Sequence, residues 1–200
     1  MKLLRNFLPV LAVTALAGCS LSSLTGGGGK PPVMLQTLTP EAADPGNIVR
    51  SAAAGQAVTI QTPVIGNELR TVRVPVQLTP TDVQYVTNLQ WVDTPDKLFQ
   101  NLVEETVRRT TTRVVLDPNQ TGIDPGIVVQ GELERFGYDS ATGQAVVAFN
   151  GTMTTPDGAQ VQTRRFVASV AADGTGPSVG PALNRAANQV AQQVAQWIGG

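Results

Sequence analysis

Carboxylates are the only side chains in this sequence suited to acid–base catalysis, because the chain contains no histidine. Glu132 and Glu134 are two residues apart in an expected strand, so both would lie on one face, as a glycosidase-type pair requires. The same spacing is typical of the solvated face of a strand, and we favour that interpretation. Glu104 and Glu105 are neighbours on an expected helix and point in different directions. We therefore expect a protein that is not an enzyme.

Two glycine-rich stretches invite a nucleotide-binding interpretation, and neither has the required spacing. Residues 26–29 are four glycines, but Lys30 runs into two prolines and no Gly-Lys-Ser/Thr follows. Residues 174–180 read G-x-G-x-x-x-G, are interrupted by Pro177 and follow a strand that does not belong to a βαβ unit. The absence of histidine also removes imidazole ligands for a metal. We expect no cofactor and no metal.

The single cysteine, Cys19, closes an N-terminal signal pattern. The first five residues carry two positive charges, residues 7–17 are almost purely apolar, and Leu16-Ala17-Gly18 precede the cysteine. A basic start, a short apolar run and a small-residue exit are typical of a secretory signal peptide. The run is shorter than the roughly 20 residues that span a bilayer. Because Leu-Ala-Gly-Cys resembles the bacterial lipobox, we expect a signal peptide over residues 1–18 and lipid attachment at Cys19.

Composition predicts a tether followed by one domain. Residues 19–32 are rich in Ser and Gly and cannot bury enough surface to order themselves, so we interpret them as a flexible linker. Residues 33–200 suit a single domain, with 42% hydrophobic residues in the whole chain. The net charge is −1 and no basic cluster is present, which excludes nucleic acid as a partner.

Hydrophobic patterns predict strands before and after a helix. Short strands are expected at residues 32–38, 57–61, 72–76, 82–86 and 89–92, and a β-branched strand ends at Leu116. Pro75 favours an edge strand or a strand end, and Thr87-Asn88 favours a hairpin turn. Residues 127–138, 144–155 and 160–171 predict an antiparallel meander. A change of phase in its third strand favours a bulge near Arg164-Arg165.

Two amphipathic helices complete the expected fold. One covers about residues 95–109, with Thr94 as N-cap and Pro95 at the first position; the other covers residues 179–198, with Ser178 as cap. The order predicts an α/β single domain, in which two helices cover a mixed sheet that includes a C-terminal antiparallel meander. Trp91 and Trp197 are expected either to pack inside the domain or to contact a partner.

Several motifs resemble the ABC-type transport auxiliary lipoproteins, the family of the paraquat-inducible system's lipoprotein. They are the lipobox, Arg73-Val74-Pro75-Val76, and the run from Leu89 to Pro95 ahead of Leu98-Phe99. The resemblance covers roughly Val33 to Ile198. Met34-Leu35 departs from the aromatic pair that the family would place in the first strand.

The resemblance implies an α/β domain without catalytic residues. Its partners would be an MCE-domain protein and, through it, an ABC permease and ATPase that move phospholipid between two membranes. The protein would anchor this assembly at the outer membrane and face the periplasm; Ser20 is compatible with outer-membrane sorting. The alternative is an assembly lipoprotein of another envelope complex, such as a cell-wall synthase activator. Homo-oligomerisation stays open.

Overall fold

The computed structural model describes residues 34–53, 55–119 and 124–199, which belong to the unit Val33–Gly200. The first half of the unit forms β1 (Met34–Gln36), β2 (Val58–Ile60), β3 (Val64–Ile65), the 3-10 helix η2 (Asn67–Leu69), β4 (Arg73–Gln77), β5 (Val83–Trp91) and α1 (Pro95–Thr110). The second half forms β6 (Val115–Leu116), β7 (Ile127–Asp139), β8 (Gln144–Thr154), β9 (Val161–Ala171) and α2 (Gly176–Gly199).

The long strand β7 organises the sheet, which has nine strands in the described residues. Along one edge β7 pairs with β8, and β8 pairs with β9, so that the three form the expected antiparallel meander. Along its other edge β7 pairs in parallel with β2, β3 and β4 at successive positions. β4 continues to β5 and then to β1. The mixed α/β fold predicted from the sequence is thus confirmed.

The bulge in the meander lies in β7, and the prediction of a bulge at Arg164-Arg165 is wrong. β9 pairs with β8 in one continuous register. The change of phase in β9 arises because Val161 lies on the exposed side and the buried series begins only at Phe166. In β7 the register shifts between Leu133 and Arg135. The extra residue turns both Leu133 and Phe136 toward the core although they are three positions apart.

Two other local predictions in the first half are also wrong. Thr87-Asn88 is no hairpin turn: β5 runs through it as one strand, and Asn88 takes a left-handed backbone with φ of 58°. The pairing of β4 with β5 shifts at this place, so the two residues form an irregularity inside the strand. Pro75 does not mark an edge or a strand end, because β4 lies between β5 and β7. Proline has no backbone N–H, but pairing with β7 begins only at Val76, so Pro75 removes no hydrogen bond between β4 and β7.

Both helices form where the apolar periodicity places them. Pro95 begins α1, and Thr94 has the extended backbone of an N-cap, although its hydroxyl makes no capping bond. α2 begins at Gly176, earlier than expected, so Ser178 is not the cap. Its Oγ lies inside the first turn and accepts a hydrogen bond from the Asp173 backbone N–H at 3.1 Å.

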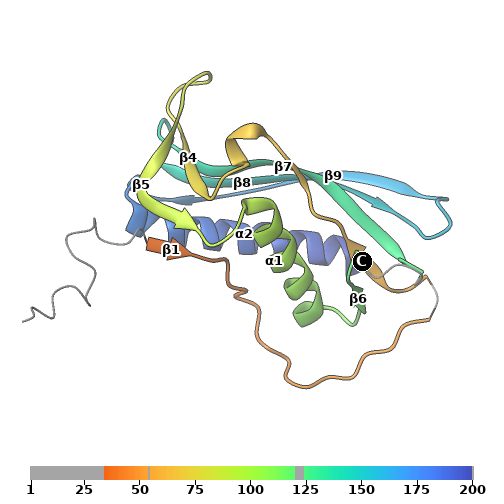
Figure 1. The fold of residues 1–200 in the computed structure, drawn as a ribbon. Helices are drawn as coiled ribbons and strands as arrows, with labels where there is room; N and C mark the ends of the chain where they lie inside the picture. The colour runs from red at the N-terminus through yellow and green to blue at the C-terminus, as the bar shows by residue number, and fades with distance from the viewer. Residues whose placement is uncertain (1–33, 54, 120–123, 200) are drawn as a thin grey trace, which may run out of the picture. The chain divides into compact units, whose positions relative to one another are not determined.

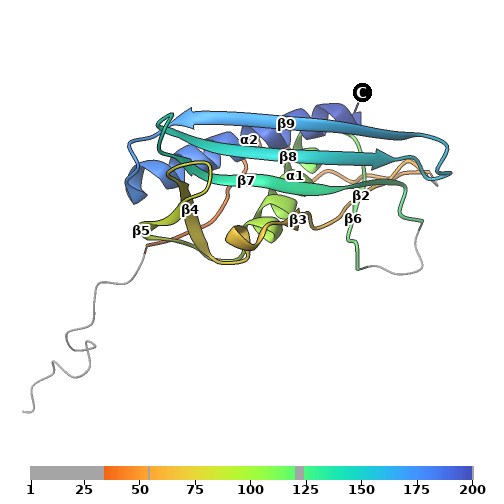
Figure 2. The same ribbon diagram turned by 90° about the horizontal axis from the view of Figure 1, so that it is seen from above.

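The two helices lie on the same face of the sheet. Figure 1 shows the meander edge-on with α1 and α2 beneath it, and Figure 2 shows both helices behind the sheet. The buried residues of α1 and α2 join those of the strands in one hydrophobic core. In the part of the chain that the structure describes, neither α-helix covers the opposite face of β7, β8 and β9, and the tip of the β4–β5 hairpin stands out on that side (Figure 1).

Asparagines of α2 hold the segment that follows β1. Asn188 is a polar residue of this helix, yet it is only 1% exposed. Its Nδ2 donates to the Thr39 carbonyl at 2.9 Å, and its Oδ1 accepts from the Glu41 N–H at 2.8 Å. The Asn184 Oδ1 accepts from the Thr39 N–H at 2.9 Å. We call Asn184 and Asn188 the asparagine clasp, since they join the start of the domain to its last helix.

Asn188→Ala is expected to lower the free energy of unfolding by about 2 kcal/mol, because it removes the two part-buried hydrogen bonds that the Asn188 amide makes with the Thr39 carbonyl and the Glu41 N–H. Urea denaturation measures the change. The exposed neighbour Gln189 supplies the control, since Gln189→Ala should alter stability by less than about 0.5 kcal/mol. Equal losses in the two variants would contradict a structural role for the clasp.

Candidate functional site

A gap in the sheet creates a small polar cavity beside the bulge of β7. β3 leaves β7 after Ile65, opposite Leu133, and β4 joins β7 only at Val76, opposite Tyr138. Among the described strands, none pairs with residues 134–137 of β7 along this edge. The helix η2 lies in the gap and buries Leu69 there.

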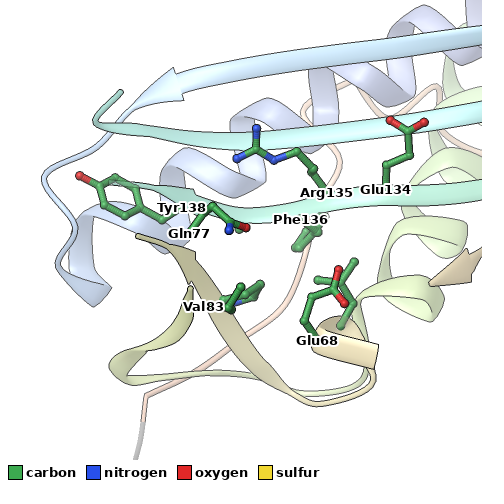
Figure 3. A pocket seen from close by; sticks show the side chains of 10 residues that line it. Glu68, Gln77, Val83, Glu134, Arg135, Phe136 and Tyr138 are labelled. Carbon is green, nitrogen blue, oxygen red and sulfur yellow. The ribbon is translucent and has the colours of Figure 1, made fainter. Parts of the chain in front are cut away.

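The cavity in this gap has a volume of about 50 Å³. Figure 3 shows Gln77, Val83 and Phe136 around it, with Glu68 on the facing η2. Its full lining is Glu68, Leu69, Pro75, Gln77, Val83, Glu134, Arg135, Phe136, Gly137 and Tyr138. A space of this size accommodates a few water molecules, whereas sites for small organic ligands measure roughly 300–1,000 Å³. The cavity is therefore not a substrate pocket.

Two charged residues of the cavity lining, Glu134 and Arg135, form ion pairs with residues outside the lining. Glu134, the extra residue of the bulge, accepts a hydrogen bond from the Arg165 Nε at 2.6 Å. Arg135 donates to the Asp139 carboxylate at 3.0 Å. The first ion pair joins β7 to β9, and the second lies within β7. The bulge also removes the simple two-residue alternation that would have made Glu132 and Glu134 a matched catalytic pair.

Asp139 is held in its charged form. The hydrogen bond from Arg135 is the main cause that lowers the pKa of this carboxyl, and the backbone N–H groups of Thr142 and Ala141 add to it. Hydrogen bonds also lower the pKa of Asp93, Asp157 and Asp173, each chiefly from a neighbouring threonine. These four carboxylates are poor general acids at neutral pH, because they give up their protons more readily than an ordinary aspartate.

Asp139→Asn is expected to cost about 1–2 kcal/mol of unfolding free energy at pH 7, since the charged hydrogen bonds to Arg135 and the turn are lost. A lowered folded-state pKa contributes stability above the unfolded value and loses it as the pH falls through the folded value. The difference between the native protein and the variant should thus shrink as the pH falls below about 4. Urea denaturation at pH 7 and pH 3 tests this, and a difference that does not change between them would contradict it.

The structure separates the two tryptophans. Trp91 is 1% exposed, and its ring meets Phe136 edge-on with centroids 5.5 Å apart. Of the two roles that the sequence left open for Trp91, this burial favours packing inside the domain. Trp197 is half-buried; its Nε1 donates to the Gln162 Oε1 at 3.2 Å, and its ring lies 5.4 Å from that of Phe166. Because part of the Trp197 side chain is exposed, a partner contact at this residue stays a proposal.

The remaining expected sites fall into two groups. Cys19 and the glycines of residues 26–29 lie outside the described residues. Glu104 is on α1 as expected, but it is buried and accepts hydrogen bonds from Arg108 at 2.9 Å and Gln100 at 3.2 Å.

Within the described ranges, no group of three His, Cys, Asp or Glu residues could bind a metal ion. In the same ranges, no helix combines the length and hydropathy needed to cross a bilayer.

The helix-free face of the sheet carries a groove that sequence reasoning did not identify. It measures about 640 Å³ and runs beside the place where the chain passes from β2 to β3. Its lining consists of Gln61, Thr62, Val64, Gln130, Gly131, Glu132, Asn150, Thr152 and Thr163. Amides and hydroxyls dominate, and Glu132 supplies the one charge. Such a surface suits hydrogen bonding to another macromolecule better than enclosure of a lipid tail.

Comparisons with known proteins agree with this fold. The family model described as ABC-type transport auxiliary lipoprotein component matches residues 37–195. A crystal structure of a protein from Xanthomonas campestris superposes with a TM-score of 0.67 at 16% identity, covering 83% of this chain and 95% of that one. A second crystal structure, of an uncharacterized protein, gives a TM-score of 0.61 at 12% identity over 75% of this chain and 96% of its own. No curated protein matches the sequence.

The described residues thus form an α/β domain with a mixed sheet, and the uncovered face of that sheet carries a polar groove. The chain belongs to the family of ABC-type transport auxiliary lipoproteins. The description of the family is that of an auxiliary lipoprotein in ABC-type transport, which is not a known class of enzymes.

Proposed function

We propose that this protein is the lipid-anchored periplasmic docking subunit of an ABC/MCE-type phospholipid transport system. Lipid on Cys19 would hold it at the outer membrane, and the domain would bind the MCE-domain protein that connects to the permease and ATPase. The observation that carries the proposal is the family match across residues 37–195. The lipobox at Cys19 supports the anchor. The carboxylates of Glu134 and Asp139 form ion pairs with arginines, which makes them less suited to catalysis and supports a role in binding.

The helix-free sheet face is the surface that we assign to the MCE partner. The opposite face is covered by α1 and α2, and the inward-facing residues of both helices are buried in the hydrophobic core. The groove beside β3 provides uncharged donors and acceptors in a wide concave area. A protein partner would also cover the sheet face around the groove, because specific interfaces bury about 800 Å² on each partner.

Site-specific photo-crosslinking tests this assignment. A photoreactive amino acid in place of Asn150, which lines the groove, should crosslink to an MCE-domain protein in intact cells. The same substitution at Gln189, exposed on α2, is the matched control and should give no such product. Crosslinking from Gln189 but not from Asn150 would reject the sheet face as the docking surface. Absence of MCE crosslinks from both, with the protein present in the membrane fraction, would count against the partner itself.

A further inference from the structure

The strand β9 leaves one long side of the sheet open. Its eleven residues pair with β8 from end to end, and among the described strands β9 has no other neighbour. In an antiparallel pair, every second residue directs its N–H and C=O away from the partner strand. Figure 2 shows β9 at the margin of the sheet, with α2 in the layer behind it. The outer side of β9 therefore presents a row of unpaired backbone groups.

Side chains leave this edge accessible. All residues from Val161 to Arg165 are exposed, and Val161 and Val167 retain 62% and 43% of their exposed surface. Long free edges pair readily with further strands, and proteins usually shorten, cover or charge them. β9 is neither short nor covered within the described residues. Its two adjacent arginines are the feature that determines what can pair with it.

Arg164 and Arg165 project to opposite faces of the sheet. Arg164 lies on the helix side, with its guanidinium 5.3 Å from the centre of the Phe166 ring, and no described carboxylate forms an ion pair with it. Arg165 lies on the helix-free side, where it binds Glu134 and keeps 55% of its side-chain surface exposed. A strand added to β9 would thus meet a guanidinium on each of its faces.

This charge pattern selects between two kinds of added strand. Pairing of the centre of β9 with β9 of a second copy would gather four arginines around the join, and like charges across a strand pair are destabilising. A strand with two adjacent carboxylates gives the opposite result. Residues directly across a pair share a face, so one carboxylate would oppose Arg164 and the next would oppose Arg165.

We propose that the β9 edge binds an extended acidic segment of a partner protein as an additional strand. Backbone hydrogen bonds to the free edge supply affinity, and an adjacent Asp/Glu pair opposite Arg164 and Arg165 supplies selectivity. The edge lies on the margin of the sheet and is separate from the groove assigned to docking. The inference does not depend on the transport role, because it rests on the exposed strand and its two charges alone.

Peptide binding to the full mature chain tests this inference. The probe is a fluorescein-labelled peptide of alternating Thr and Val with a central Glu-Glu pair, and matched peptides carry Gln-Gln or Lys-Lys instead. The Glu-Glu peptide should bind about tenfold tighter than the Gln-Gln peptide, and the Lys-Lys peptide should bind weakest. Hydrogen exchange of the β9 amides that point outward should slow when the Glu-Glu peptide is bound.

Charge reversal supplies the decisive comparison. The double substitution Arg164→Glu and Arg165→Glu should reverse the preference, so that the Lys-Lys peptide binds better than the Glu-Glu peptide. Arg164→Glu alone breaks no ion pair, and it should still lower the affinity for Glu-Glu if the double variant fails to fold. Arg185→Glu, at an exposed position on α2, is the control and should leave binding unchanged.

Three results would overturn the inference. The first is equal affinity for the three peptides, and the second is peptide binding without slower hydrogen exchange in β9. The third is protection of β9 that rises with protein concentration in the absence of peptide, because a second copy of the chain would then occupy the edge.

Discussion

Trp91→Ala is expected to lower the free energy of unfolding by about 4 kcal/mol, a large share of the stability of a domain of this size. Trp91 ends β5, is only 1% exposed and packs edge-on against Phe136. The substitution would leave a cavity between β5 and β7, where the core joins the strands before α1 to the meander. Urea denaturation followed by far-ultraviolet circular dichroism measures the loss.

Trp91→Phe is the matched control for this prediction. The Trp91 Nε1 is buried and has no hydrogen-bond partner among the described residues. Phenylalanine keeps an aromatic ring against Phe136 and removes the unpaired donor, so it should cost about 1 kcal/mol or less. A loss in Trp91→Phe as large as in Trp91→Ala would show that Nε1 makes an essential hydrogen bond. Normal stability of Trp91→Ala would show that the ring does not support the core.

Cys19→Ala is expected to abolish lipid attachment and outer-membrane placement. The lipobox interpretation makes the cysteine sulfur the acceptor of the lipid, and alanine offers no nucleophile. Labelling of cells with radioactive palmitate should give a labelled band for the native protein and none for the variant. Density-gradient separation should find the native protein with the outer membrane and the variant elsewhere.

Ser20→Ala serves as the control for the anchor, because it changes the adjacent residue and keeps the cysteine. It should incorporate palmitate as the native protein does. Palmitate incorporation into Cys19→Ala, or its normal outer-membrane placement, would refute the anchor at this residue. The folded domain itself should be unaffected, since the asparagine clasp begins only at Thr39.

Periodicity in the sequence was sufficient for the larger elements of this fold. The apolar series on α1 and α2 and the alternation in β8 are local signals, and each element lies within a few residues of its predicted range. The predictions failed where long-range pairing decides the outcome. β3 has only two residues, and its strand character comes from its parallel partner β7. Thr87-Asn88 has the sequence of a turn, but Asn88 takes its left-handed backbone conformation inside the strand β5.

The surface was less predictable than the fold, because exposure depends on neighbours that are distant along the chain. Asn188 belongs to a polar series on α2, and only the folded chain brings Thr39 and Glu41 to its amide. Trp91 gave no local sign of whether the core or a partner contacts its ring. The bulge at Glu134 shifts the alternation of buried and exposed residues in β7 by one position, and no turn-forming residue in the sequence indicates it.

The asparagine clasp joins the segment that would follow the proposed tether to α2. The proposed lipid tether enters the domain ahead of β1, which pairs with β5 over only three residues. Hydrogen bonds from Asn184 and Asn188 hold the following residues against α2. A load on the tether would therefore pass into the longest helix as well as into a short strand.

Affinity purification of the full lipidated protein from gently solubilised membranes tests the central claim most directly. Mass spectrometry should find an MCE-domain protein together with its ABC permease and ATPase, and recovery of these proteins should fall when Cys19→Ala is used. Reproducible absence of the MCE protein from lipid-intact preparations, or its replacement by cell-wall synthases, would contradict the proposed role.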